Sequence, residues 1–134
     1  SHSLTGALIV IARKNDLSEF KETGLAVDAI ISDQLIESIF YKNNPMHDGA
    51  VIISDNKIKT ARCILPVSGK MDLPPEFGLR HRAAIGITEK NDSIAIIVSE
   101  QTGRISYCRN GELALDIKAS GLKTMLTEDF SDKE

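Results

Sequence analysis

The sequence predicts a single α/β domain with a central mixed β-sheet flanked by helices. Its 134 residues suit one domain with its own hydrophobic core. Continuous apolar, β-branched runs at residues 5–12, 50–54 and 93–100 are typical of buried strands. Segments with helical spacing lie between and after these runs. The expected order is strand, helix, strand, helix, three or four further strands with one more helix, and a terminal helix.

The first quarter of the chain is expected to give a strand, a short helix and a second strand. Residues 5–12 form the first run, which we expect to be buried on both faces. A helix should follow, with Asp16 as a plausible N-cap and Gly24 as its stop. Residues 25–31 are apolar and short, and we expect them to be extended.

A second helix is expected after residue 31. Ser32 or Asp33 can cap its start, and Asn43, Asn44 and Pro45 mark its end. Its apolar positions recur at helical spacing and are Leu35, Ile36, Ile39 and Phe40.

The middle of the chain is expected to contain a hairpin. The buried strand at 50–54 leads through a tight turn at 55–57 into a longer strand at 58–67. A loop with two prolines should occupy 68–78.

Helix-compatible composition around residues 82–85 precedes another predicted hairpin, formed by residues 93–100 and 104–111. From residue 112 the pattern predicts an amphipathic terminal helix, broken or kinked at Gly121. Its inward residues would be Leu113, Ile117, Leu122 and Met125.

The composition argues against some classes of function. A net charge of −3 and a pI near 5.6 argue against broad nucleic-acid binding, although a few arginines can still bind a small anion.

Cys63 and Cys108 lack CxxC spacing, so we expect reduced, buried thiols and a cytosolic setting. No apolar run approaches the roughly 18 residues that span a bilayer. Residues 1–4 look like a tag or linker remnant, residues 5–127 like a domain excised from a longer protein, and residues 128–134 like a tail.

His47, Asp48 and Gly49 stand directly in front of a buried strand. Asp48 should therefore lie at the rim of the sheet, where α/β folds place ligands. Its carboxylate could accept a proton or bind a divalent cation. Gly49 would let a ligand or another backbone come close. The alternative is a simple turn in which Asp48 caps its own backbone.

Arg80, His81 and Arg82 put two permanent cations and one titratable group into three residues. An arginine fork matches a phosphate, and a helix start adds free backbone N–H groups. Side chains two apart on a helix diverge, so Arg80 and Arg82 should not face one phosphate. The alternative is a solvated helix start.

Ser99 and Glu100 end a buried strand at a sheet rim. The hydroxyl could bind a phosphate and the carboxylate a metal. The alternative is a hairpin corner with a solvent-facing glutamate.

Together, HDGAVII, LPVS, GLRHRAAIGIT and IIVSEQTG resemble the diadenylate cyclase (DAC) domain family, in its order and spacing. The resemblance is strongest to the membrane-anchored, CdaA-type branch. It implies the DAC fold and the condensation of two ATP into cyclic di-3′,5′-adenylate and two pyrophosphates, with Mg²⁺ or Mn²⁺ and sometimes Co²⁺. It also implies a face-to-face homodimer in the cytoplasm, within a full-length protein anchored at the cell membrane. Regulatory protein partners are not indicated.

The resemblance also implies roles for individual residues. The catalytic residues would be Asp48, Arg80, His81 and Arg82. The nucleotide would be bound by Gly49, Ala50, Leu65, Gly78, Leu79, Arg80, His81, Arg82 and Ser99. The metal would be bound by Asp48, Glu100 and His47. Leu79 stands where many members have threonine, and Gln101 where many have a second glutamate. Two alternatives remain, a catalytically silent nucleotide-binding regulatory module and a scaffold domain with coincidental motifs.

Overall fold

A seven-stranded mixed sheet forms the centre of the protein, in the order β2-β4-β3-β1-β5-β6-β7. The computed structural model describes residues 6–41, 48–65, 78–100 and 102–131. The strands are β1 (Ala7–Ala12), β2 (Leu25–Ile30), β3 (Ala50–Ser54), β4 (Lys57–Cys63), β5 (Ser93–Val98), β6 (Ile105–Arg109) and β7 (Glu112–Ile117). The helices are α1 (Ser18–Lys21), α2 (Asp33–Ile39), α3 (Leu79–Lys90) and α4 (Ala119–Ser131). The predicted α/β architecture with a mixed sheet is confirmed.

β1 lies in the middle of the sheet and sets its mixed character. It runs parallel to β3, with Ile9 opposite Val51, and antiparallel to β5, with Ile9 opposite Ile96. All other neighbouring strands are antiparallel. The first residues of β1 and β3 and the last residues of β5 therefore lie at one end of the sheet.

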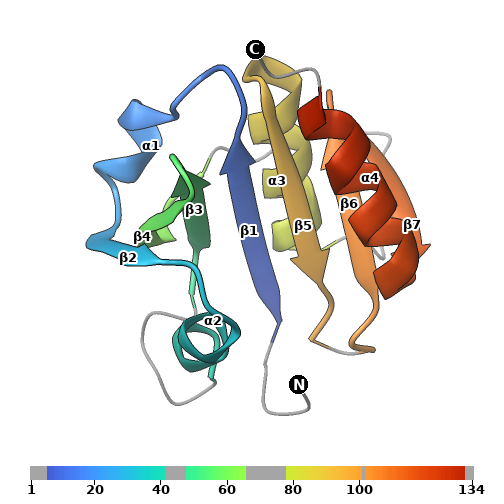
Figure 1. Ribbon diagram of the computed structural model, residues 1–134, viewed down its shortest axis with the longest axis horizontal. Helices are drawn as coiled ribbons and strands as arrows, with labels where there is room; N and C mark the ends of the chain where they lie inside the picture. The colour runs from blue at the N-terminus through green and yellow to red at the C-terminus, as the bar shows by residue number, and fades with distance from the viewer. Residues whose placement is uncertain (1–5, 42–47, 66–77, 101, 132–134) are drawn as a thin grey trace.

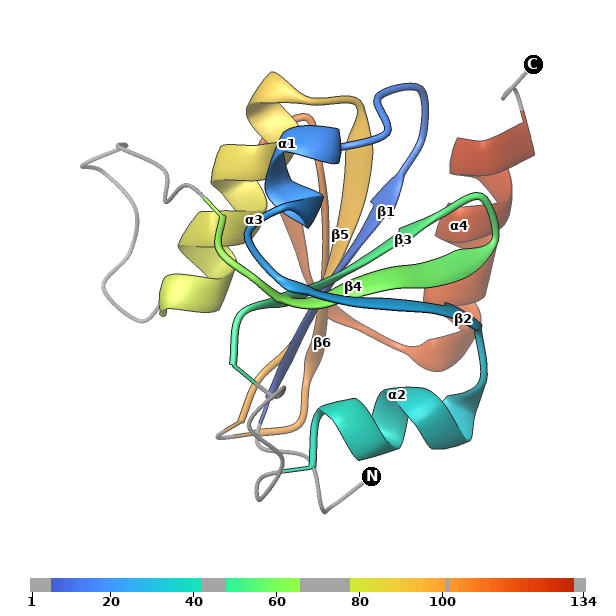
Figure 2. The same ribbon diagram turned by 90° about the vertical axis from the view of Figure 1, so that its left-hand side faces the viewer.

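Helices cover both faces of the sheet (Figures 1 and 2). Helices α1 and α3 lie on one face, over a core that includes Leu8, Val10 and Ile52. Helices α2 and α4 lie on the other, where Ile39 of α2 and its C-cap residue Phe40 belong to the second core cluster. The central strands are apolar at nearly every position because both of their faces are covered.

The second predicted helix is confirmed, with one of its two predicted caps, but it ends at Ile39, earlier than expected. Ser32 is the N-cap of α2, and its Oγ accepts a hydrogen bond from the Leu35 N–H at 3.1 Å. The predicted turn after β3 is also confirmed, because Asp55 and Asn56 both have positive φ angles, as in the two-residue turns of hairpins. Both cysteines are free, buried thiols.

The predicted ends of the first helix are wrong. Leu17 is the N-cap of α1, and Asp16 instead accepts hydrogen bonds from the backbone and hydroxyl of Ser18. The helix ends at Lys21, three residues before Gly24. A Cβ at Gly24 would lie 2.4 Å from the Ala61 carbonyl oxygen, so this glycine permits close approach to β4 rather than stopping a helix.

The expected terminal helix from residue 112 is also wrong. Residues 112–117 form β7, and α4 begins only at Ala119. Asn110 and Gly111 have φ angles of 55° and 78°, which produce a two-residue turn that folds β7 back onto β6. Helix α4 runs without a break through Gly121 and continues past residue 127 to Ser131.

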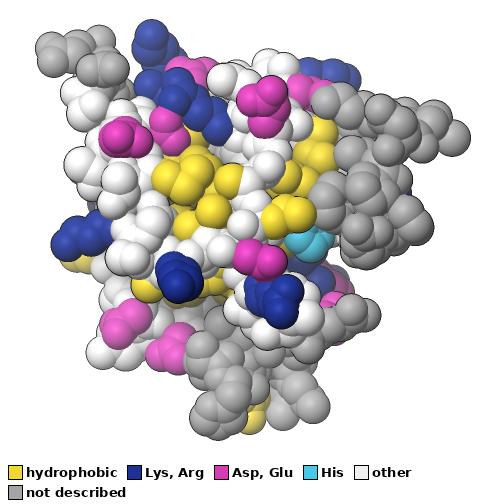
Figure 3. All heavy atoms as spheres, turned by 90° about the vertical axis from the view of Figure 1, so that its right-hand side faces the viewer, with side chains coloured by type: hydrophobic (Ala, Val, Ile, Leu, Met, Phe, Trp, Pro, Cys, Tyr) yellow, Lys and Arg dark blue, Asp and Glu magenta, His cyan; other side chains and the backbone are white. Residues whose placement is uncertain are grey.

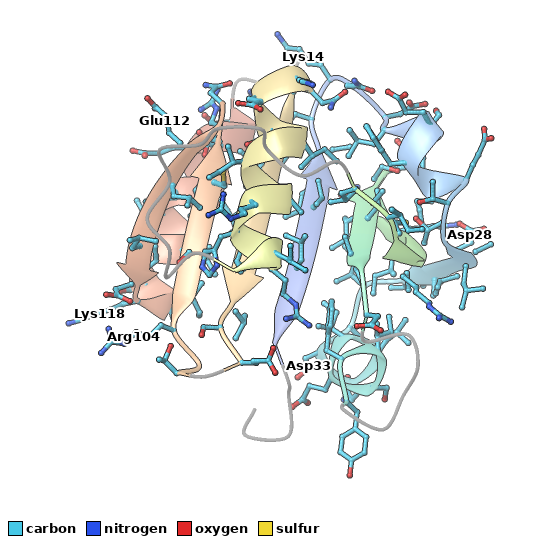
Figure 4. All side chains as sticks on the ribbon, turned by 180° about the vertical axis from the view of Figure 1, so that it is seen from behind. Lys14, Asp28, Asp33, Arg104, Glu112 and Lys118 are labelled. Atoms are coloured by element: carbon cyan, nitrogen blue, oxygen red, sulfur yellow. The ribbon has the colours of Figure 1, made fainter. Side chains whose placement is uncertain are left out.

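β7 is the last strand of the sheet and is only partly covered. Apolar side chains gather on this side of the molecule, surrounded by charged ones (Figure 3). Leu115 is half exposed there, whereas Leu113 packs against the core beneath α3. Seen from the α3 side, Arg104 and Lys118 lie at one end of the sheet, and Lys14 and Glu112 lie at the other (Figure 4).

Candidate functional site

Two adjoining cavities lie at the end of the sheet where β1, β3 and α3 begin and β5 ends. The Asp48 cavity has a volume of about 310 Å³, and its lining consists of Leu8, Asp48, Gly49, Ala50, Cys63, Ile64, Leu65, Leu79, Arg80 and Ala83. The Ser99 cavity has a volume of about 260 Å³, and its lining consists of Gly78, Leu79, Arg80, His81, Ile97, Val98, Ser99 and Glu100. Leu79 and Arg80 belong to both cavities.

The Asp48–Gly49 segment is shaped by its contact with β4. Gly49 has a φ of +76°, and a Cβ there would lie 2.6 Å from the Cys63 carbonyl oxygen and 2.9 Å from the Arg62 carbonyl carbon. Only glycine fits this close approach of two backbones. The missing side chain therefore makes room for β4, and the resulting bend leaves Asp48 exposed at the mouth of the cavity.

The start of α3 places the basic residues. Gly78 is the N-cap and offers no side-chain cap, so the first N–H groups of this 12-residue helix lack that partner. Arg80 lines both cavities, whereas Arg82 is half-buried and lines neither. Both residues lie in α3, where positions two apart are separated by about 200° around the helix axis, so the divergence expected from the sequence applies.

Arg80 is held by contacts from two other segments. Its Nη1 lies 3.3 Å from Glu100 Oε1, and its buried Nε has no hydrogen-bond partner among the described residues. Gly6 precedes β1 with a φ of +134°, and a Cβ there would lie 3.2 Å from the Arg80 Cζ. The absence of a side chain at Gly6 therefore leaves space for Arg80 beside the start of the central strand.

His81 lies in the Ser99 cavity and favours its neutral form. Burial lowers the pKa of His81, and the positive charge of Arg80 lowers it further. At neutral pH the imidazole therefore acts as a hydrogen-bonding group, and the permanent charge of the basic triplet comes from the arginines.

Ser99 begins a tight turn and lines a cavity at the same time. Its N–H donates to the Arg104 carbonyl oxygen at 3.0 Å, and its Oγ accepts from the Thr102 N–H at 3.3 Å. The hairpin corner that we considered as an alternative for this segment is therefore present, and Ser99 and Glu100 nevertheless face the Ser99 cavity.

The carboxylates expected to bind a metal are divided between the cavities. Asp48 lines one and Glu100 the other, and the described residues contain no group of three His, Cys, Asp or Glu that could hold a metal ion. His47 lies outside the described residues. Mg²⁺ is commonly held by one or two carboxylates together with substrate phosphates, so the exposed Asp48 carboxylate fits that donor set.

Several cavity residues were not found by sequence reasoning. Leu8, Cys63, Ile64 and Ala83 form apolar walls, and Gly6 supports Arg80. The strand alternation of β1 puts Leu8 on the same face as Val10, but only the fold shows that this face reaches the Asp48 cavity. The sequence around Leu65, including Cys63 and Ile64, contains no motif that indicates a cavity wall.

An arginine at a helix start beside an apolar cavity with a single carboxylate fits an α/β domain that binds a ligand with an apolar part and an anionic part. The comparisons specify the family. The profile described as DisA bacterial checkpoint controller nucleotide-binding matches residues 1–113, and the chain belongs to this DAC family.

The relatives share both sequence and fold. The cyclic di-AMP synthase CdaA of Bacillus subtilis is 45% identical over 125 residues, which cover 93% of this chain and 46% of that protein. A diadenylate cyclase of Listeria monocytogenes is 48% identical, with the same coverage. The crystal structure of a DacA double mutant from Staphylococcus aureus matches with a TM-score of 0.90 and 42% identity, and covers 94% of this chain and 84% of that one. The chain spans about half the length of the curated relatives it matches.

Proposed function

We propose that this domain is a diadenylate cyclase that condenses two ATP into cyclic di-3′,5′-adenylate and two pyrophosphates. The observation that carries the proposal is the position of Arg80, which lines a mainly apolar cavity with Asp48 at its mouth and a second, more polar cavity with His81 and Ser99. One cavity suits a base and sugar, and the other suits phosphates. The printed names of the relatives support the same activity.

In the proposed complex, adenine lies against Leu65, Leu8 and Ala83 of the Asp48 cavity. Ala50 is buried beneath it, and Gly78 and Leu79 form the edge shared with the phosphates. Leu79 offers only apolar surface where many family members have a hydroxyl.

The phosphates would lie near Arg80, His81 and Ser99. The Arg80 guanidinium can donate two parallel hydrogen bonds to a phosphate. Neutral His81 and the Ser99 hydroxyl add hydrogen bonds without further charge. We assign Arg82, which lies on another side of α3, to a different phosphate group or to the partner subunit.

Each half of the reaction joins two nucleotides. The 3′-oxygen of one bonds to the α-phosphorus of the other, the α–β anhydride bond breaks and pyrophosphate leaves. The hydroxyl proton passes to the Asp48 carboxylate, whose exposed position lets a second nucleotide reach it. Nucleotidyl transfer depends mainly on alignment and on neutralising charge, which Arg80 supplies here.

The proposal includes a divalent metal, Mg²⁺ or Mn²⁺ and possibly Co²⁺. Asp48 would bind it together with the phosphates, and His47 is a further candidate ligand. The metal would neutralise charge on the phosphates when bound. Glu100 was expected to be a ligand as well, but its pairing with Arg80 supports the different role argued below.

Catalysis would require a homodimer, because each subunit binds one ATP and the reaction needs two. Two large apolar residues at the mouth of the Asp48 cavity support an interface there. Ile64 is 71% exposed and Leu79 is 75% exposed, and both line the cavity. Apolar surface of this kind is commonly covered by a partner. Activity should therefore rise faster than linearly with protein concentration while dimers form transiently.

The test uses Asp48→Asn, with Asp55→Asn in the distant β3–β4 turn as a control for the same change of charge. With ATP and Mn²⁺, chromatography should show cyclic di-AMP and pyrophosphate from the unchanged protein and from Asp55→Asn. Loss of a general base costs about a hundredfold or more, so Asp48→Asn should form almost no product while still binding ATP. Full turnover by Asp48→Asn would refute the assignment.

The second candidate is a silent regulatory module that binds adenine nucleotides on the same fold. It predicts that ATP raises the melting temperature but that no pyrophosphate forms. A scaffold domain would show neither effect. The proposal is favoured because Asp48 lies at the cavity mouth, which pure binding of an anion does not require.

We place the domain in the cytoplasm, within a full-length protein anchored at the cell membrane. No described helix is long and apolar enough to cross a membrane. Support for the anchor comes from a Bacillus cereus relative whose structure is described as that of a hypothetical membrane spanning protein, with 46% identity. Fractionation of cells that express the full-length gene would test this, and recovery of the protein only in the supernatant would contradict it.

A further inference from the structure

We propose that Glu100 is a positioning residue that holds the Arg80 guanidinium between the two cavities before the nucleotide binds, in a space that the absence of a side chain at Gly6 leaves open. The inference rests on the proposed function in one respect, because the anion to be bound is taken to be the triphosphate of ATP.

Arg80 needs such support because of its length. A free arginine side chain populates many rotamers, and fixing a side chain of this kind on binding reduces affinity. The Arg80 side chain is only 26% exposed, and its Nε is buried without a described partner. The guanidinium is therefore already withdrawn from solvent at the boundary of both cavities.

Glu100 supplies the first contact, through its Oε1 at 3.3 Å from Arg80 Nη1. The Glu100 side chain is 59% exposed, and exposed pairs of this kind contribute little to stability. Its main effect would be to select one orientation of the guanidinium. Because Glu100 follows β5 and Arg80 lies on α3, the pair also joins the two walls of the Ser99 cavity.

Gly6 leaves room for this pair because it has no side chain. A Cβ at this position would lie 3.0 Å from the Glu100 Cβ and 3.2 Å from both Cζ and Nη1 of Arg80. The backbone of Gly6 therefore closes the side of the pair that faces β1. Three segments distant in the sequence meet at this point, and none of these contacts involves the mouth of the Asp48 cavity.

Three roles for Glu100 predict different effects on ATP affinity. If Glu100 positions Arg80, its removal weakens ATP binding, with or without metal. If it only adds negative charge near the phosphates, its removal strengthens binding. If it is a metal ligand, its removal changes binding in the presence of metal but not in EDTA.

The experiment measures the ATP dissociation constant of the whole chain by calorimetry in EDTA. Glu100→Ala should weaken binding about three- to tenfold, comparable to the cost of ordering one long side chain. Glu100→Gln should lose less, because its amide oxygen can still accept from Arg80. Asp116→Asn is the matched control, because Asp116 is also 59% exposed and lies 3.4 Å from Arg104 outside both cavities. This control should bind ATP as the unchanged protein does.

A double-mutant cycle identifies the group through which Glu100 acts. In an Arg80→Ala background, Glu100→Ala should cause no further loss of affinity. Equal losses in both backgrounds, unchanged affinity of Glu100→Ala, or tighter binding would each overturn the inference. Urea unfolding midpoints of the variants should match that of the parent, and a large drop for Glu100→Ala would indicate a structural role instead.

The outcome is separable from that of the proposed function. If the unchanged protein binds ATP but forms no cyclic product with Mn²⁺, the proposed activity is refuted and the affinity cycle still tests the role of Glu100. If it forms product and Glu100→Ala binds ATP normally, the positioning role alone is refuted. Absence of ATP binding by the unchanged protein overturns both.

Discussion

Replacing Gly49 by alanine should destabilise the fold, although this glycine lies in the segment that resembles a catalytic motif. Its φ of +76° costs a non-glycine residue about 1–2 kcal/mol. The new Cβ would also lie 2.6 Å from the Cys63 carbonyl oxygen. Because the obstacle is strand backbone, which cannot rotate away, we expect about 1–3 kcal/mol more, as for other overpacked sites. Together these effects amount to about 2–5 kcal/mol.

The assay is urea unfolding, with Gly103→Ala as the matched control. Gly103 has a nearly identical φ of +72°, but a Cβ there would meet no atom within 4 Å. The control should therefore show only the conformational cost, and the difference between the two variants measures the close approach to β4. Equal losses in both variants would refute the argument that β4 requires a glycine at position 49.

Two further predictions concern pH. Burial and Arg80 lower the pKa of His81 below its usual 6.5, so only the unfolded chain takes up this proton as the pH first falls below 6.5. The unfolding free energy should therefore decrease as the pH falls below 6.5, and it should level off below the pKa of His81 in the folded protein. In urea unfolding at a series of pH values, His81→Asn should show a smaller change of midpoint over this range. The same change of midpoint in both proteins would contradict the assignment. Burial and Asp129 raise the pKa of Tyr107 above its usual 10, so stability should decrease as the pH rises past 10. Tyr107→Phe should reduce this loss of stability above pH 10. At neutral pH the same variant should be less stable by about 1 kcal/mol, since the hydrogen bond to Asp129 is removed. An equal loss of stability above pH 10 in both proteins would exclude Tyr107 as its source.

The error at the C-terminal end shows where local pattern is insufficient. Residues 112–117 contain Glu, Leu and Ala, which favour helix when taken alone. Asn110-Gly111 is a hairpin signal, and it lies directly before them. The turn folds the segment onto the open edge of β6, and the hydrogen bonds of that pairing outweigh the local preference.

At the candidate site, too, some features could be predicted from the sequence and others could not. Asp48 and Arg80 could be selected from the sequence only because several motifs occur together in the order and spacing of one family, since each stretch taken alone has a simple structural alternative. The contact between Arg80 and Glu100, twenty positions apart, could not. Nor could the division of Asp48 and Glu100 between two cavities, which depends on where β3 and β5 end around β1.

By itself, the sequence determined the α/β class, the buried central strands and the short polar segments that line the two cavities, because periodicity and residue chemistry are local properties. Only the tertiary structure decided that residues 112–117 are a strand, that Gly49 serves its contact with β4, and that Gly6 and Glu100 meet at Arg80. The reason is physical: these outcomes depend on which backbones and charges become neighbours, and a linear pattern does not specify neighbours that are distant along the chain.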